Sequence, residues 1–326
     1  MSRARITPVF VLAAPRSGTT WLTQALNAHP DVFATELRAF GQYFDAVHDA
    51  GASTPRLRVT MDCYVDALLT SHVWPALGAP RQATKTALID GIYQTIFGHA
   101  LDHSGKSVCI DKVTPYAGTA GAVVAGIRSH FPSAKVIYLA RDGRDVAVSG
   151  VFHWFSKNMV GETLTPEQVQ RRAAFAGGAE GSLRRFFTTP ELVQWTDHWR
   201  DVAVAAAADA RASSGLQLRV SYEALSTGFC DEFRRILEFI GAPDASMSAA
   251  EACLRASTFE RMSGGRQRGD AVPGAHVRKG VVGDWRQYFT HEDAAIFDEI
   301  AGTQLIAGGY EPDRRWIDAA PSRLAA

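Results

Sequence analysis

The sequence predicts an α/β fold of three layers, α/β/α, in which helices cover both faces of a mostly parallel central sheet. Short, continuous apolar runs alternate along the chain with segments of helical spacing. Runs of this kind, stopped by Pro, Gly or charged residues, are typical of parallel strands buried on both faces. Because strands followed by helices build βαβ units, we expect residues 1–326 to form a single domain. The predicted strands are residues 9–12, 107–110, 136–140 and 216–220.

The first predicted strand, Val9–Leu12, leads into a turn and a helix that together indicate an anion-binding site. Backbone N–H groups and the positive end of a helix dipole face whatever lies above such a turn. The arrangement is P-loop NTPase-like, but the nucleoside triphosphate loop reads GxxxxGK[ST], whereas this turn has one glycine, preceded by its cation. The residues that would hold the anion are Arg16, Ser17, Gly18, Thr19, Thr20 and Trp21.

The composition restricts the classes of partner. The chain has 34 Lys and Arg against 34 Asp and Glu, so it lacks the overall positive charge of a nucleic-acid-binding protein, and any anion site must be local. Its four cysteines form no CxxC pair, which indicates buried thiols in a reducing compartment. No apolar run approaches the roughly 18–20 residues of a membrane span. We therefore expect a cytoplasmic protein without a membrane span or a metal site.

A second motif, KVIYLARDGRDVAVS at residues 135–149, places a cation and a hydroxyl group beside a helix start. Arg141 follows the predicted strand directly, and Ser149 lies two turns into the next helix. A guanidinium group can donate two parallel hydrogen bonds to phosphate oxygens, and the serine hydroxyl can donate another. The spacing therefore predicts a phosphate-binding site.

Further cations stand in the middle and near the end of the chain. Lys112 follows the strand at residues 107–110, on the side of a parallel sheet where ligands bind. The glycine-rich, basic stretch that ends in RKGVVGDW, residues 278–285, combines two adjacent cations with Gly280, which lets the backbone close on an anion. Together these cations favour a small ligand with two separated phosphate groups. They are Arg16, Lys112, Arg141, Arg278 and Lys279.

In this order, the motifs resemble those of the sulfotransferases that use 3′-phosphoadenosine 5′-phosphosulfate (PAPS). PRSGTTW resembles their 5′-phosphosulfate loop, and R-x7-S and RKGxxGDW resemble their 3′-phosphate site. The resemblance extends from Val9 to about Thr290, but it is absent where an acceptor would bind. It implies a sulfotransferase domain with PAPS as donor co-substrate and no metal. It also implies nucleotide contacts for Tyr222 in SYEAL and for Ser257 and Phe259 in STFERM.

The resemblance also suggests which residues carry the chemistry. Glu36, in TELRAF, corresponds to the glutamate of the KELxxF stretch, which takes the proton of the acceptor hydroxyl, although the usual preceding lysine is missing. Glu36 could instead simply open a helix. Lys112 lies in DKVTPY, where Thr114 replaces the histidine that is the base in phenol and steroid enzymes. We therefore expect Glu36 as base, with Arg16 and Lys112 stabilising the leaving group; His153 is another candidate base.

The predicted function is transfer of a sulfuryl group from PAPS to a hydroxyl or amine of a small molecule or glycan. Two alternatives stay open at this stage. A P-loop kinase of small molecules would require ATP and Mg²⁺, and a non-catalytic protein would bind the nucleotide without turnover. The sequence identifies neither the acceptor nor whether the chain forms a homo-oligomer.

Overall fold

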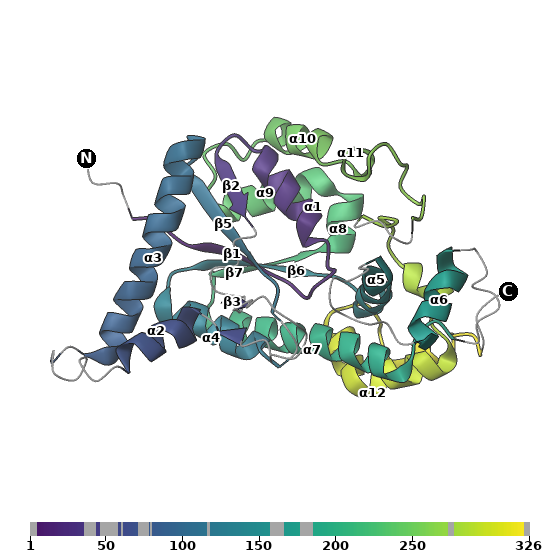
Figure 1. Ribbon diagram of the computed structural model, residues 1–326. Helices are drawn as coiled ribbons and strands as arrows, with labels where there is room; N and C mark the ends of the chain where they lie inside the picture. The colour runs from purple at the N-terminus through teal and green to yellow at the C-terminus, as the bar shows by residue number, and fades with distance from the viewer. Residues whose placement is uncertain are drawn as a thin grey trace.

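The computed structural model describes residues 5–35, 44–45, 58–59, 61–70, 78, 80–115, 118–156, 166–176, 185–272 and 277–322. Its centre is a five-stranded sheet of order β2-β5-β1-β6-β7, in which every neighbouring pair is parallel (Figure 1). A separate antiparallel pair joins β3 (Phe44–Asp45) to β4 (Arg58–Val59). The prediction of a mostly parallel sheet is confirmed. The main strands are β1 (Val9–Leu12), β2 (Val32–Thr35), β5 (Val108–Val113), β6 (Lys135–Ala140) and β7 (Gln217–Ser221).

Helices cover both faces of the sheet, as the sequence predicts. Along β1, Phe10 and Leu12 join one buried apolar cluster, and Val9 and Val11 join another, because successive strand side chains point to opposite faces. In Figure 1, α1, α8, α9 and α10 lie above the sheet and α4, α7 and α12 lie below it. The helices are α1 (Thr19–Ala28), α2 (Met61–Leu69), α3 (Arg81–Ser104), α4 (Ala120–His130), α5 (Gly143–Ser156), α6 (Pro166–Ala176), α7 (Thr189–Ala212), α8 (Tyr222–Thr227), α9 (Phe229–Ile240), α10 (Met247–Ala256), α11 (Phe259–Ser263) and α12 (His291–Ala307), with the 3₁₀ helices η3 (Asp284–Gln287) and η4 (Arg314–Ile317).

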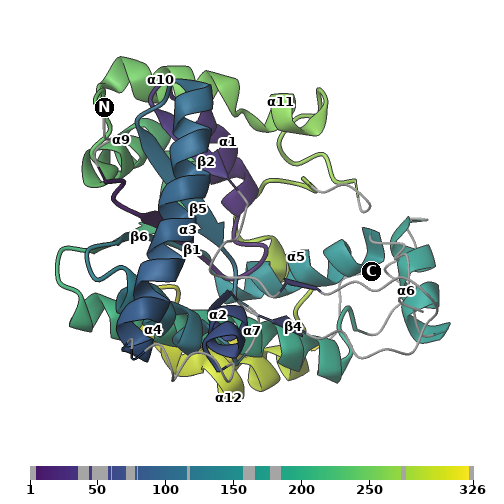
Figure 2. The same ribbon diagram turned by 60° about the vertical axis from the view of Figure 1, so that its left-hand side comes forward.

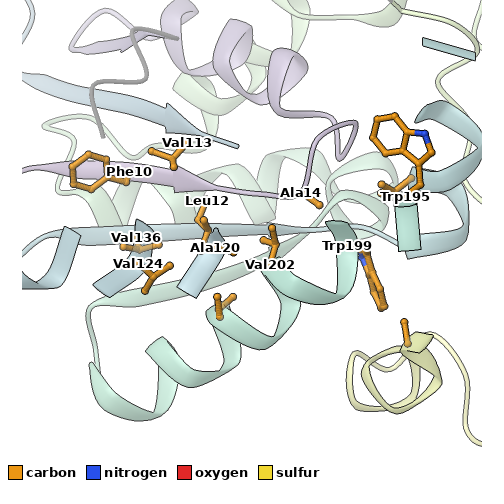
Figure 3. Close-up of a cluster of buried hydrophobic side chains, with 14 of the residues drawn as sticks. Phe10, Leu12, Ala14, Val113, Ala120, Val124, Val136, Trp195, Trp199 and Val202 are labelled. Carbon is orange, nitrogen blue, oxygen red and sulfur yellow. The ribbon is translucent and has the colours of Figure 1, made fainter. Parts of the chain in front are cut away.

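The long helix α7 lies in the layer below the sheet and packs against α5 (Figure 1). Its inward face carries Trp195, Trp199 and Val202, which belong to the same apolar cluster as Phe10 and Leu12 (Figure 3). The two indole rings fill the space left by two glycines of α5: a Cβ on Gly143 would lie 2.5 Å from the Trp199 ring, and one on Gly150 would overlap the Trp195 ring. Close packing therefore holds α5, which follows β6, against α7.

Two strands differ from the prediction. β5 continues through Asp111 and Lys112 to Val113, because its residues 110–113 pair with β1, whereas its residues 108–111 pair with β2. Lys112 therefore lies within the strand and not after it. β2 has no counterpart among the predicted strands, since a four-residue edge strand gives too short a pattern to separate from a loop.

The described part of the chain contains no helix that is long and apolar enough to cross a lipid bilayer. Within the same residues, no group of three or more His, Cys, Asp or Glu side chains is arranged to hold a metal ion.

Candidate active site

The turn between β1 and α1 has the backbone conformation of an anion cradle. Arg16 has a φ of 71°, an uncommon value for a residue other than glycine, and Gly18 has a φ of 92°. Gly18 is the N-cap of α1, and no side chain caps this helix start. A Cβ at Gly18 would also lie 2.5 Å from the Tyr222 ring. Glycine is therefore required here both for the turn and for the approach of the tyrosine.

Arg141, directly after β6, connects this turn to the basic segment at residues 277–283 that precedes η3, which we call the late loop. Its Nη1 donates to the carbonyl of Arg16 at 3.0 Å, and its Nη2 donates to the carbonyl of Val281 at 3.4 Å. The guanidinium lies over the Tyr222 ring, 4.3 Å from its centre. Trp199 Nε1 donates to the carbonyl of Arg141 at 2.8 Å, so α7 also fixes the backbone at this point.

Arg16 stands in a strongly positive environment. Its Nε donates to Ser149 Oγ at 3.4 Å, which joins the first motif to the second. Burial lowers the pKa of Arg16 to about 10, and the neighbouring charges of Arg141 and Arg278 contribute to the shift. Three guanidinium groups thus act on one another, and a bound anion would relieve their repulsion.

The late loop is held against α5 by a buried carboxylate. Asp145 accepts hydrogen bonds from the backbone N–H groups of Gly283 at 2.8 Å and Trp285 at 2.9 Å. Burial raises the pKa of the Asp145 carboxyl, although Arg141 Nη2, 3.8 Å away, acts in the opposite direction. Gly280 has a φ of 68°, and the Phe259 ring occupies the space of its missing side chain. These contacts place the loop over the cradle.

The cradle, α5, α8, α11 and the late loop enclose one pocket of about 820 Å³, counting the part open to solvent. Figure 2 shows α11 and the chain that follows it on the same side of the sheet as α1. Cations gather in this pocket beside aromatic rings, an arrangement that suits an anion carrying a flat ring system. The predicted site residues that line it are Arg16, Gly18, Thr19, Thr20, Trp21, Arg141, Ser149, Tyr222, Phe259, Arg278, Lys279 and Gly280.

A family model described as the sulfotransferase family matches residues 8–246, which is most of the chain. This chain belongs to the sulfotransferase family. Sulfotransferase 2B1 of Rattus norvegicus is 28% identical over 201 residues, which cover 58% of this chain and 53% of the relative. The 3-beta-hydroxysteroid sulfotransferase of Cavia porcellus is 29% identical over 196 residues, covering 57% and 60%. The matched region spans about half to three fifths of the length of these curated relatives.

The fold of this family member also resembles a solved structure over nearly its whole length. The crystal structure of mouse sulfotransferase SULT7A1 complexed with PAP has a TM-score of 0.52. The alignment covers 97% of this chain and 89% of the mouse chain at 18% identity. At this identity, the similarity establishes the fold.

Two predicted nucleotide contacts do not line the pocket. Ser17 is buried at 1% exposure, and its Oγ has no hydrogen-bond partner among the described residues. Ser257 is fully buried, and its Oγ donates to the carbonyl of Cys253 at 2.8 Å, so it closes the end of α10. The next residue, Thr258, caps α11 by accepting from the N–H of Arg261.

Of the two other predicted catalytic residues, Lys112 does not line the pocket. Lys112 is 5% exposed and pairs in register with Val11 of β1. It shares a strand face with Ile110, two residues earlier, which packs in the apolar cluster on the α1 side of the sheet. Lys112 is therefore a buried cation on the same face as the cradle. Glu36 lies outside the described residues.

Sequence reasoning missed four residues of the pocket. Met262 follows Phe259 by one helical turn, so helical spacing could have identified it. Arg268 lies over the Trp21 ring at 5.7 Å, but no motif marks it within the glycine-rich stretch. The remaining two, Val277 and Val281, flank the Arg278–Gly280 segment.

Proposed function

We propose that this sulfotransferase transfers the sulfuryl group of PAPS to a hydroxyl or amine of a small-molecule or glycan acceptor. One observation carries the proposal: residues from the three motifs that resemble the PAPS site line a single pocket, although they lie more than 250 residues apart in sequence. The pocket combines helix N-terminal backbone, five cations and aromatic rings. This combination supports a nucleotide with two separate phosphate centres.

Each part of the donor has a candidate binding group. The start of α1, with Arg16, would bind the 5′-phosphosulfate. Arg141, Ser149 and the Arg278–Gly280 segment would bind the 3′-phosphate. Trp21 and Phe259 would contact the adenine, and Tyr222 would lie beside it. The mouse sulfotransferase of the solved structure was crystallised with PAP, adenosine 3′,5′-bisphosphate. This ligand supports a 3′-phosphorylated adenosine nucleotide as the donor.

The proposed chemistry is an in-line transfer that requires no metal. Glu36 would take the proton of the acceptor while the acceptor oxygen or nitrogen forms a bond to sulfur. The bond between sulfur and the bridging oxygen of the 5′-phosphate breaks, and its electron pair stays on that oxygen. Arg16 and Lys112 would stabilise the charge that develops there. Since an arginine cannot readily lose a proton, Lys112 is the better candidate for a proton donor.

The proposed acceptor class follows from the chemistry of the candidate base. Where the histidine base of the phenol and steroid enzymes would stand, this chain has Thr114, so the proton must pass to another group. A carboxylate has an ordinary pKa of about 4 and becomes a better base when desolvation raises it. Glu36 could fill this role towards an alcohol. One relative is named for 3-beta-hydroxysteroids, which are alcohols.

Thermal unfolding tests the donor before the acceptor is known. Adenosine 3′,5′-bisphosphate (PAP), the product nucleotide, at 100 times its dissociation constant should stabilise the protein by about 2.7 kcal/mol. This corresponds to a rise in the unfolding midpoint of a few degrees. ATP with Mg²⁺ serves as the comparison. A shift with ATP and Mg²⁺ alone would contradict the proposal and favour a small-molecule kinase.

A further inference from the structure

A buried carboxylate stands directly behind two cations of the pocket. Asp284, the first residue of η3, has a side chain that is 2% exposed and does not itself line the pocket. Its Oδ1 accepts from Lys279 Nζ at 2.7 Å, and its Oδ2 accepts from Arg278 Nη2 in a close ion pair. Burial would raise the pKa of this carboxyl, but the two cations outweigh burial and lower it. Asp284 is therefore ionised and holds both cations.

The contacts of Arg278 leave one edge of its guanidinium for a ligand. Its plane lies over the Phe152 ring at 4.3 Å and near the Tyr288 ring at 5.8 Å. Nη2 is engaged by Asp284, whereas Nη1 is buried and has no hydrogen-bond partner in the described part of the chain. A buried guanidinium N–H without an acceptor is costly. Because Arg278 lines the pocket, a ligand oxygen is the natural acceptor for Nη1.

Asp284 is itself held in place from both sides. The backbone N–H groups of its neighbours, Gly283 and Trp285, donate to Asp145, whose side chain is fully buried. Asp145 also lies 3.8 Å from Arg141 Nη2. Two buried carboxylates thus stand behind three of the pocket cations and connect α5 to the late loop. A carboxylate held rigidly in this way fixes the orientation of the cationic side chains that it contacts, in addition to balancing their charge.

We propose that Asp284 is a positioning residue, which orients Arg278 and Lys279 towards the 3′-phosphate of the donor nucleotide. It thereby sets the preference for a 3′-phosphorylated nucleotide over the same nucleotide without that group. This assignment rests on the proposed function. The opposing account is that Asp284 competes with the phosphate for the two cations. The two accounts differ in sign, because removing a competitor strengthens binding, whereas removing a positioning group weakens it.

The variant Asp284→Asn separates these accounts by calorimetric titration with two ligands, PAP and adenosine 5′-monophosphate. We expect the dissociation constant for PAP to rise by about tenfold or more, which corresponds to the loss of one well-oriented charge-assisted contact. The constant for the monophosphate should stay within about twofold. Tighter PAP binding would overturn the assignment in favour of competition. An equal loss for both ligands would overturn it in favour of general disruption of the loop.

Asp209→Asn is the matched control, because it removes another buried carboxylate that is paired with an arginine. Asp209 accepts from Arg128 Nε at 2.7 Å and Nη2 at 2.8 Å, and neither residue lines the pocket. Its ratio of the two dissociation constants should equal that of the wild type. If Asp284→Asn does not fold, Asp284→Glu provides the test, since it keeps the charge but moves the carboxylate by one methylene. Partial loss of the preference supports positioning, and an unchanged preference overturns it.

The wild-type protein distinguishes failure of this inference from failure of the proposed function. A wild type that binds the two nucleotides equally contradicts the PAPS assignment, and the role of Asp284 falls with it. A wild type that prefers PAP, together with an Asp284→Asn variant that keeps the preference, contradicts the role of Asp284 alone.

Discussion

Arg16 Nε donates a hydrogen bond to Ser149 Oγ at 3.4 Å across 133 residues of sequence. The bond joins the turn after β1 to the second turn of α5. The PRSGTTW and R-x7-S motifs therefore form one site. At this length the hydrogen bond is weak. A phosphate oxygen can therefore replace it at little cost in stability, while both side chains stay in place.

The first prediction concerns this hydroxyl. Ser149→Ala removes a hydrogen-bond donor to the 3′-phosphate, so we expect the dissociation constant for PAP to rise by about tenfold. The free energy of unfolding should change by less than about 1 kcal/mol, because only a long hydrogen bond is lost. Titration calorimetry and denaturant unfolding measure the two effects.

Ser246→Ala is the control for that variant. Ser246 caps α10 by accepting from the N–H of Ala249, and it does not line the pocket. Its loss should cost about 1 kcal/mol of stability without changing PAP affinity. Unchanged PAP binding in Ser149→Ala would exclude the hydroxyl from the site.

The second prediction separates two reasons for glycine in the cradle. Gly18→Ala introduces both a strained φ and a clash with the Tyr222 ring. We expect PAP binding to be lost and stability to fall by about 2–4 kcal/mol. Gly105→Ala is the control, since Gly105 has a φ of 69° with no atom within 4 Å of the added Cβ. It should lose only the strain, about 1 kcal/mol, and bind PAP normally. Equal losses of stability would contradict the role of the Tyr222 contact.

Much of the fold could be predicted, because buried parallel strands are short apolar runs that polar residues stop. The same rule failed at β5, where Asp111 pairs with both β1 and β2 and Lys112 continues the strand through its pairing with β1. It also failed at β2, which is too short to give a clear pattern. Tertiary pairing decided both cases, and no local pattern carries that information.

The grouping of the pocket residues was predictable because glycines and cations mark the ends of strands and the starts of helices. The supporting contacts were not. Asp284 holds the Arg278–Lys279 pair, and Asp145 holds the loop through backbone N–H groups. The motif around Ser257 resembles one that contacts the nucleotide, yet the Ser257 hydroxyl donates a hydrogen bond to the backbone carbonyl of Cys253. Which hydroxyl faces a ligand and which closes a helix depends on packing, which the spacing of residues does not specify.

The third prediction concerns pH. His198 of α7 packs beside Trp195, and burial lowers its pKa below the ordinary 6.5, against the opposing effects of the Gln194 carbonyl and Asp197. The unfolded chain therefore binds a proton at a higher pH than the folded protein does. Stability from this group is present above pH 6.5 and is lost as the pH falls towards the folded pKa. His198→Gln should accordingly show a shallower loss of stability between pH 7 and pH 5.

Urea unfolding at several pH values measures this difference. His99→Gln is the control, because His99 is exposed on α3. A slope in His198→Gln as steep as in the wild type would show that other groups cause the acid sensitivity.

The last prediction concerns the base. Glu36→Gln keeps the size of the side chain but removes its ability to take a proton. General base catalysis contributes about 10²–10⁴-fold, so transfer from PAPS to an acceptor found by screening should fall by about that factor. PAP affinity should stay within about twofold, since Glu36 acts on the acceptor. Glu167→Gln, which changes an exposed glutamate in the first turn of α6, controls for the loss of a helix-start carboxylate. If Glu36→Gln retains full turnover, Glu36 only opens a helix, and His153→Gln becomes the next variant to measure.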